Sequence, residues 1–81
     1  MSEQNLGAEF NRRLLEEKIL EIIKNRDEIT FDELRELLEI EGLYYDGLYI
    51  RRVVSDLIRR GVVAKMISSN RRNKFILRIN Q

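Results

Sequence analysis

Residues 50–67 read IRRVVSDLIRRGVVAKMI, and within them the spacing of apolar side chains changes from helical to extended. Before Gly61, apolar residues recur three, four, seven and eight positions after Ile50, which predicts an amphipathic helix over residues 47–60. After Gly61 the period becomes two, which predicts a strand. Glycine readily adopts the left-handed conformation that ends many helices. We therefore expect a helix that stops at Gly61 and passes directly into a strand.

A second strand is predicted over residues 74–79, because Phe75, Leu77 and Ile79 alternate there with the other side chains. The intervening segment 68–73, SSNRRN, consists of polar residues that favour turns, and two of them are arginines. The two strands should therefore form an antiparallel hairpin with a basic tip.

Two further helices are predicted before residue 47. The first covers residues 8–25, and its buried stripe consists of Leu15, Ile19, Ile22 and Ile23. Thr30 and Glu33 have the spacing of a capping box, which predicts a second helix that ends near Ile40, with Glu41 and Gly42 as its stop. Residues 29–31 could add a short extended piece to the hairpin. Residues 8–81 are thus expected to form one domain after a flexible segment at 1–7.

The first helix carries a second apolar stripe that the three-helix core does not need. Leu6, Phe10 and Leu14 lie four residues apart and are rotated away from the buried stripe. The stripe could pack against the end of the hairpin or against a second copy of the chain. Because so small a domain buries little surface, we predict a homodimer formed through Leu6, Phe10 and Leu14.

The composition argues against most chemical functions. The chain has no cysteine and no histidine, which removes thiolate and imidazole catalysts and the usual zinc ligands. Its carboxylates are distributed on predicted helix surfaces, and no glycine-rich phosphate loop is present. No apolar run approaches the length that spans a bilayer. We expect a cytoplasmic, non-enzymatic protein without catalytic residues, metal, cofactor, membrane contact or small-molecule substrate.

The charges separate along the chain. Residues 1–41 carry six basic and twelve acidic side chains, a balance of −6, whereas residues 42–81 carry nine basic and two acidic ones, a balance of +7. A concentration of positive charge in one half of a small domain favours a polyanionic partner. Double-stranded DNA is the partner that we expect.

The sequence VVSDLIRRGVV at residues 53–63, together with the order of elements, resembles the winged helix-turn-helix DNA-binding domains of small archaeal and bacterial transcriptional regulators. The connection at residues 42–47 is longer than the tight turn usual in that family. The resemblance implies an α+β fold, with a three-helix core followed by a two-stranded β-hairpin wing. It also implies a sequence-specific regulator, with the third helix in the major groove and the wing on the backbone or in the minor groove. The alternative is a winged-helix adaptor that binds protein and not DNA.

Placing Ile50, Val53, Val54 and Leu57 inward directs the other face of the third helix toward the DNA. The side chains predicted on that outward face are Leu48, Tyr49, Arg52, Ser55, Asp56 and Arg59. Arg52 is the candidate for guanine recognition, whereas Arg59 and Arg60 are expected to contact phosphates. Alternatively, the arginines of the helix form an ordinary solvated face, and the cations of the hairpin only keep an exposed strand edge soluble. Phe31 and Phe75 are predicted core residues, and one ring of Tyr44 and Tyr45 is expected to cover the core. The residues predicted to contact DNA are Tyr49, Arg51, Arg52, Ser55, Arg59, Arg60, Lys65, Arg71, Arg72 and Lys74.

Overall fold

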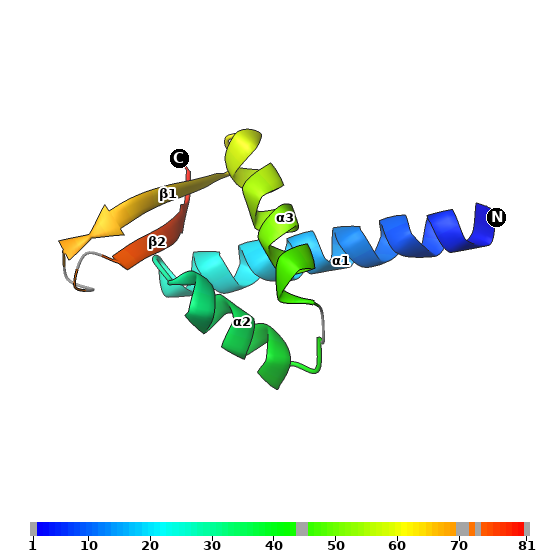
Figure 1. Cartoon of the computed structure of the whole chain (residues 1–81), viewed down its shortest axis with the longest axis horizontal. Coiled ribbons are helices and arrows are strands. Elements are labelled where there is room, and N and C mark those ends of the chain that lie inside the picture. Colours follow the sequence, from blue (N-terminus) through cyan, green and yellow to red (C-terminus); the bar gives the residue numbers. More distant parts are fainter. Residues whose placement is uncertain (1, 44–45, 70–71, 73, 81) are drawn as a thin grey trace.

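The computed structural model describes residues 2–43, 46–69, 72 and 74–80, with side chains from residue 11 onward. The order of elements is α1 (Ser2–Arg26), α2 (Phe31–Ile40), α3 (Gly47–Arg59), β1 (Val63–Ser68) and β2 (Lys74–Ile79), as Figure 1 shows. Three helices followed by an antiparallel hairpin form the α+β layout of a winged helix. The fold class predicted from the sequence is therefore confirmed.

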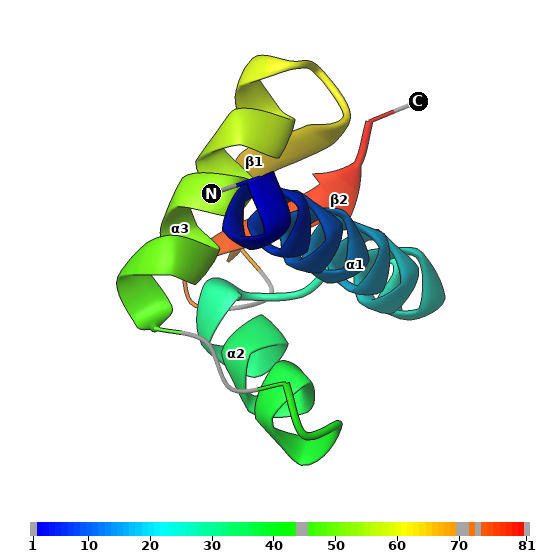
Figure 2. The same cartoon turned by 90° about the vertical axis from the view of Figure 1, so that its right-hand side faces the viewer.

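Helix α1 is the longest element and is only partly covered by the rest of the molecule. It begins at Ser2, six residues before the predicted start at Ala8. The predicted stripe is buried in the core from Leu15 to Ile23. Figure 1 shows the N-terminal half of α1 extending away from α2, α3 and the hairpin, and Figure 2 looks along it. At about 1.5 Å per residue, the 25-residue helix is roughly 37 Å long.

Helix α2 begins and ends as its sequence predicts. The Thr30 hydroxyl accepts a hydrogen bond from the Glu33 amide at 3.2 Å, and the Glu33 carboxylate accepts one from the Thr30 amide at 3.0 Å. This reciprocal pair satisfies two amides that the first helical turn leaves without partners. At the other end Gly42 has a φ of +79°. The predicted capping box and glycine stop are both confirmed.

Helix α3 passes into the hairpin with only a short connection. Asp46 caps the helix by accepting a hydrogen bond from the Leu48 amide at 3.2 Å. Gly61 has a φ of +79°, and the following amide, of Val62, donates to the Leu57 carbonyl at 3.0 Å. This arrangement is a Schellman motif, in which glycine supplies the left-handed conformation. The turn brings the chain into β1 at Val63, as the change of sequence period predicts.

The hairpin is anchored to the helices through a third short extended piece. Val63 pairs with Ile79 at the base of the hairpin, and Ser68 pairs with Lys74 near its tip. Leu77 also exchanges two backbone hydrogen bonds with Ile29, of 3.1 and 2.7 Å, so the predicted extended piece before α2 is confirmed. The core cluster consists of Leu15, Ile19, Ile22, Ile23, Ile29, Leu34, Leu38, Ile50, Val53, Val54, Leu57, Val63 and Leu77.

The two phenylalanines predicted for the core differ in their surroundings. Phe31 is half-buried and packs against the core cluster. Phe75 is 55% exposed, so its assignment to the core is wrong. It pairs with Ile67 near the hairpin tip, where Figure 1 shows the hairpin extending past the helices. Strand alternation predicts which side of the sheet a residue occupies, but not how far along the strand the helices reach.

Candidate nucleic-acid interface

The outward face of α3 is rich in arginine. Ile50, Val53 and Leu57 are buried, whereas the arginines and the serine predicted to contact DNA on this helix are exposed. These exposed side chains are Arg51, Arg52, Ser55 and Arg59. Helix α3 is therefore oriented as its sequence predicts, with the apolar stripe toward the core and the arginines toward solvent. The residues that face away from the core include the predicted guanine contact, Arg52.

Two side chains that were placed on this outward face lie elsewhere. Tyr49 is half-buried and packs against the core cluster, because it lies one turn before the buried Val53 on the same stripe. Asp56 is half-buried and its carboxylate contacts Arg12 of α1. The outward assignment of both residues is therefore wrong. The four-residue spacing of Tyr49 and Val53 could have indicated the first of these positions from the sequence.

Helix α2 supplies a cation that the sequence reasoning missed. The guanidinium carbon of Arg35 is 3.7 Å from the position that a Cβ would occupy on Gly47, the first residue of α3. Arg35 is exposed, so its charge is available to a ligand beside the start of α3. Arg35 belongs to residues 1–41, whose net charge of −6 gives no indication of a cation that could bind an anion. Helical spacing places Arg35 beside the buried stripe of Leu34 and Leu38 but does not indicate that it reaches α3.

Arg51 is held against α2 by an aromatic ring. Its guanidinium carbon lies 4.6 Å from the centroid of the Phe31 ring. A guanidinium over an aromatic face gains favourable electrostatic energy and loses some of its rotamer freedom. The residue nevertheless remains exposed. Arg51 is thus a positioned cation at the junction of α2 and α3.

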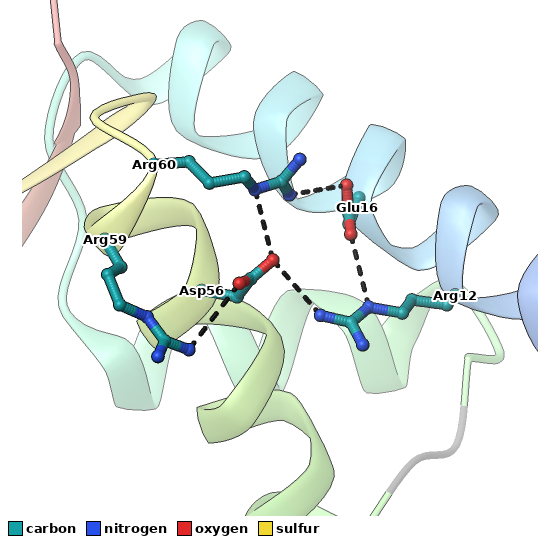
Figure 3. A network of polar contacts seen from close by, with 5 residues as sticks. All are labelled: Arg12, Glu16, Asp56, Arg59 and Arg60. Atoms are coloured by element: carbon teal, nitrogen blue, oxygen red, sulfur yellow. Dashed lines mark hydrogen bonds and ion pairs between the residues drawn. The ribbon is translucent and has the colours of Figure 1, made fainter.

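The carboxyl-terminal end of α3 is tied to α1 by a closed ring of alternating charges (Figure 3). Asp56 accepts from Arg12 and from Arg60, each at 3.1 Å. Glu16 binds the same two arginines, at 3.3 Å for Arg12 and 2.9 Å for Arg60. The Glu16 hydrogen bond raises the pKa of Arg60. Two carboxylates and two guanidinium groups thus balance each other between the helices.

This ring separates the two neighbouring arginines that were predicted to contact phosphates. Arg60 directs its guanidinium toward α1, where Glu16 binds it, and Asp56 of α3 binds it as well. The side chain of Arg59 is 80% exposed and approaches Asp56 only at 3.6 Å. Arg59 is therefore the more available of the two for a ligand. Sequence spacing could not distinguish them, because Glu16 lies 44 residues from Arg60.

The described part of the hairpin presents three of the predicted cations. Lys65, Arg72 and Lys74 are exposed, whereas Arg71 lies outside the described residues. The Lys65 ammonium is 4.4 Å from the centroid of the Phe75 ring. Arg78 lies on the side of the sheet opposite Lys65 and on the same side as Lys74, and it lines a groove of about 950 Å³ between α1 and the hairpin. The hairpin cations are thus distributed over both sides of the sheet.

The proposed dimer contact is described only in part. Leu14 is 42% exposed on α1, and the side chains of Leu6 and Phe10 lie outside the described residues, as do Tyr44 and Tyr45. Figure 1 shows the hairpin tip and the N-terminus of α1 at opposite ends of the molecule. Whether this stripe packs against the end of the wing or against a second copy of the chain therefore stays a prediction.

Comparison of the chain with protein-family models, curated proteins and solved structures gave no match. Of the helices that the structure describes, none combines the length and the apolar character needed to cross a membrane. The features of the molecule that bear on its function are the geometry and charge of α3 and the hairpin.

Proposed function

We propose that the protein binds double-stranded DNA as a sequence-specific transcriptional regulator, with α3 in the major groove and the hairpin on the adjacent backbone or minor groove. The observation that carries this proposal is the uncompensated arginine face of α3. Both acidic residues of the basic half are used internally, since Asp46 caps α3 and Asp56 binds arginines. Within the described residues, Arg51 and Arg52 form no ion pair. Their charge is therefore available to phosphates and base edges.

The positions on α3 suggest a division of roles. Arg52 and Ser55 are exposed near the middle of the helix, where a helix in the major groove meets base edges. Arg59 lies at the end of the helix and Arg35 beside its start, which suits contacts with phosphates on either side of the groove. Arg60 supports α3 through its ion pair with Glu16 of α1. Tyr49 packs against the core cluster, so we do not include it among the proposed base contacts.

We also propose that the functional unit is a homodimer formed through the projecting half of α1. A helix that extends from its domain gains little stability in water by itself. The exposed Leu14 continues the sequence stripe of Leu6 and Phe10 toward the N-terminus. Symmetric association along this stripe would present two copies of α3 to a palindromic site.

A binding selection on randomised duplexes tests the proposed function, with wild type, Arg52→Ala and Arg52→Lys compared. We expect wild type to enrich a defined site. Arg52→Ala should lose preference at one base pair at a cost of about 1–3 kcal/mol on the preferred site. Arg52→Lys keeps the charge without the two-pronged guanidinium, and should retain affinity for random duplex while losing most of that preference. Absence of duplex binding by wild type at low salt would favour the adaptor alternative.

A further inference from the structure

Two large apolar side chains lie exposed near the tip of the hairpin. Ile67 on β1 and Phe75 on β2 are direct cross-strand partners, and they are 60% and 55% exposed. Cross-strand partners occupy the same side of an antiparallel sheet with their Cβ atoms about 5 Å apart. The two side chains therefore form a single apolar pair at the part of the hairpin that has passed beyond the helices.

The pair lies on the side of the sheet that enters the core. Val63 and Leu77 are an even number of residues from Ile67 and Phe75, and both belong to the core cluster. The opposite side of the sheet carries Arg78, which lines the groove beside α1. The apolar pair thus continues the core-facing side of the sheet past the end of the core.

The charges around the pair favour an anionic ligand. No acidic residue follows Asp56 in the sequence. Lys65 lies over the Phe75 ring on the same side of the sheet, and Arg72 is in the turn between the strands. Lys74 precedes Phe75 in the chain and lies near the hairpin tip on the other side of the sheet. A protein partner whose surface carries both acidic and basic residues would not match the purely basic surroundings of this pair. A DNA minor groove offers both parts of the match, because rows of phosphates flank an apolar base stack.

We propose that Ile67 and Phe75 form an apolar wedge that enters the minor groove beside the site contacted by α3, where it partly unstacks a base step and bends the duplex. This inference rests on the proposed DNA binding and adds the feature that the wing recognises. Flexible pyrimidine–purine steps are the easiest to unstack, so they should be preferred at the position of the wedge. Arg72 and Lys74 hold the phosphates beside the opened step, while Lys65 stays over the Phe75 ring.

The test measures bending and binding on the same duplex. A duplex that holds the selected site carries a fluorescent donor and acceptor at its two ends, and the full chain is titrated while anisotropy reports binding. Wild type should raise the energy transfer at saturation, as expected for a bend of roughly 20–90°. Phe75→Ser with Ile67→Ser should abolish this rise and weaken binding several-fold. Met66→Ser is the matched control, since Met66 is also exposed but lies on the other side of the sheet.

The outcomes separate the wedge from DNA binding itself. Absence of any anisotropy change with wild type would contradict the proposed function. Binding without a rise in energy transfer, or an equal rise with the double variant, would overturn the wedge while leaving DNA binding intact. A further arm uses vesicles of phosphatidylcholine and phosphatidylserine. Vesicle binding that requires Phe75, together with unchanged DNA bending by the double variant, would assign the pair to a lipid surface.

Discussion

Removing one arginine from α3 and one from the hairpin should reduce the salt dependence of DNA binding by a predictable amount. In the proposed complex, five exposed and described cations contact phosphates, namely Arg35, Arg51, Arg59, Arg72 and Lys74. Each neutralised phosphate releases condensed counterions and contributes about −0.9 to the slope of log K against log salt. The slope for one protomer should therefore be about −4.5.

The double variant Arg59→Ala with Arg72→Ala removes two of these contacts, which should change the slope to about −2.7. Between 50 and 200 mM salt, Kd should then rise by about 40-fold, compared with about 500-fold for wild type. Neither side chain is part of the core, so the variant should fold normally.

Fluorescence anisotropy on a duplex of about one helical turn measures both slopes. The matched control is Arg13→Ala with Lys24→Ala, which removes two exposed cations from α1 and causes the same loss of net charge. It should leave the slope close to that of wild type. If the control lowers the slope as much as the interface variant does, binding depends on net charge alone, and the assignment of α3 and the hairpin as the interface is wrong.

Three further predictions concern association and stability. Phe10→Glu with Leu14→Glu should convert a dimer to a monomer in sedimentation velocity, and a wild type that is monomeric at high concentration would contradict the dimer. Asp56→Asn should lower Tm by a few degrees at low salt and by less at 1 M salt, because screening weakens the ion pairs that it removes; an equal loss at both salt concentrations would exclude an electrostatic cause. Thr30→Ala should destabilise the protein by about 1 kcal/mol in urea unfolding, whereas Thr30→Ser should retain most of the cap.

The elements of the fold could be predicted because their signals are local. The capping box at Thr30 and the left-handed glycines at positions 42 and 61 each act within a few residues of the chain. The buried stripe of α3 follows from helical periodicity alone. The exposure of Phe75 could not be predicted in this way, because it depends on where the hairpin leaves the helices. Strand alternation assigns a side of the sheet and carries no information about that boundary.

The candidate interface was predictable in its composition but not in its detailed contacts. The +7 balance of residues 42–81 identified the basic half. It could not distinguish Arg59 from Arg60, which are adjacent in sequence but differ in exposure and in their ion-pair partners. It also omitted Arg35, which reaches the start of α3 from an acidic helix. Both differences arise from contacts between segments that are distant in the sequence, and net charge does not report such contacts.

The charge ring between α1 and α3 connects the two proposed surfaces. Arg12 and Glu16 belong to α1, one and two turns after the position of Ala8, and they bind Asp56 and Arg60 at the end of α3. Leu14 lies between them in the sequence and is exposed on the same helix. If two copies associate along α1, the ring therefore transmits the geometry of that association to each α3. The spacing of the two DNA half-sites would then be set by α1, so breaking the ring should loosen the preferred spacing before it abolishes binding to a single half-site.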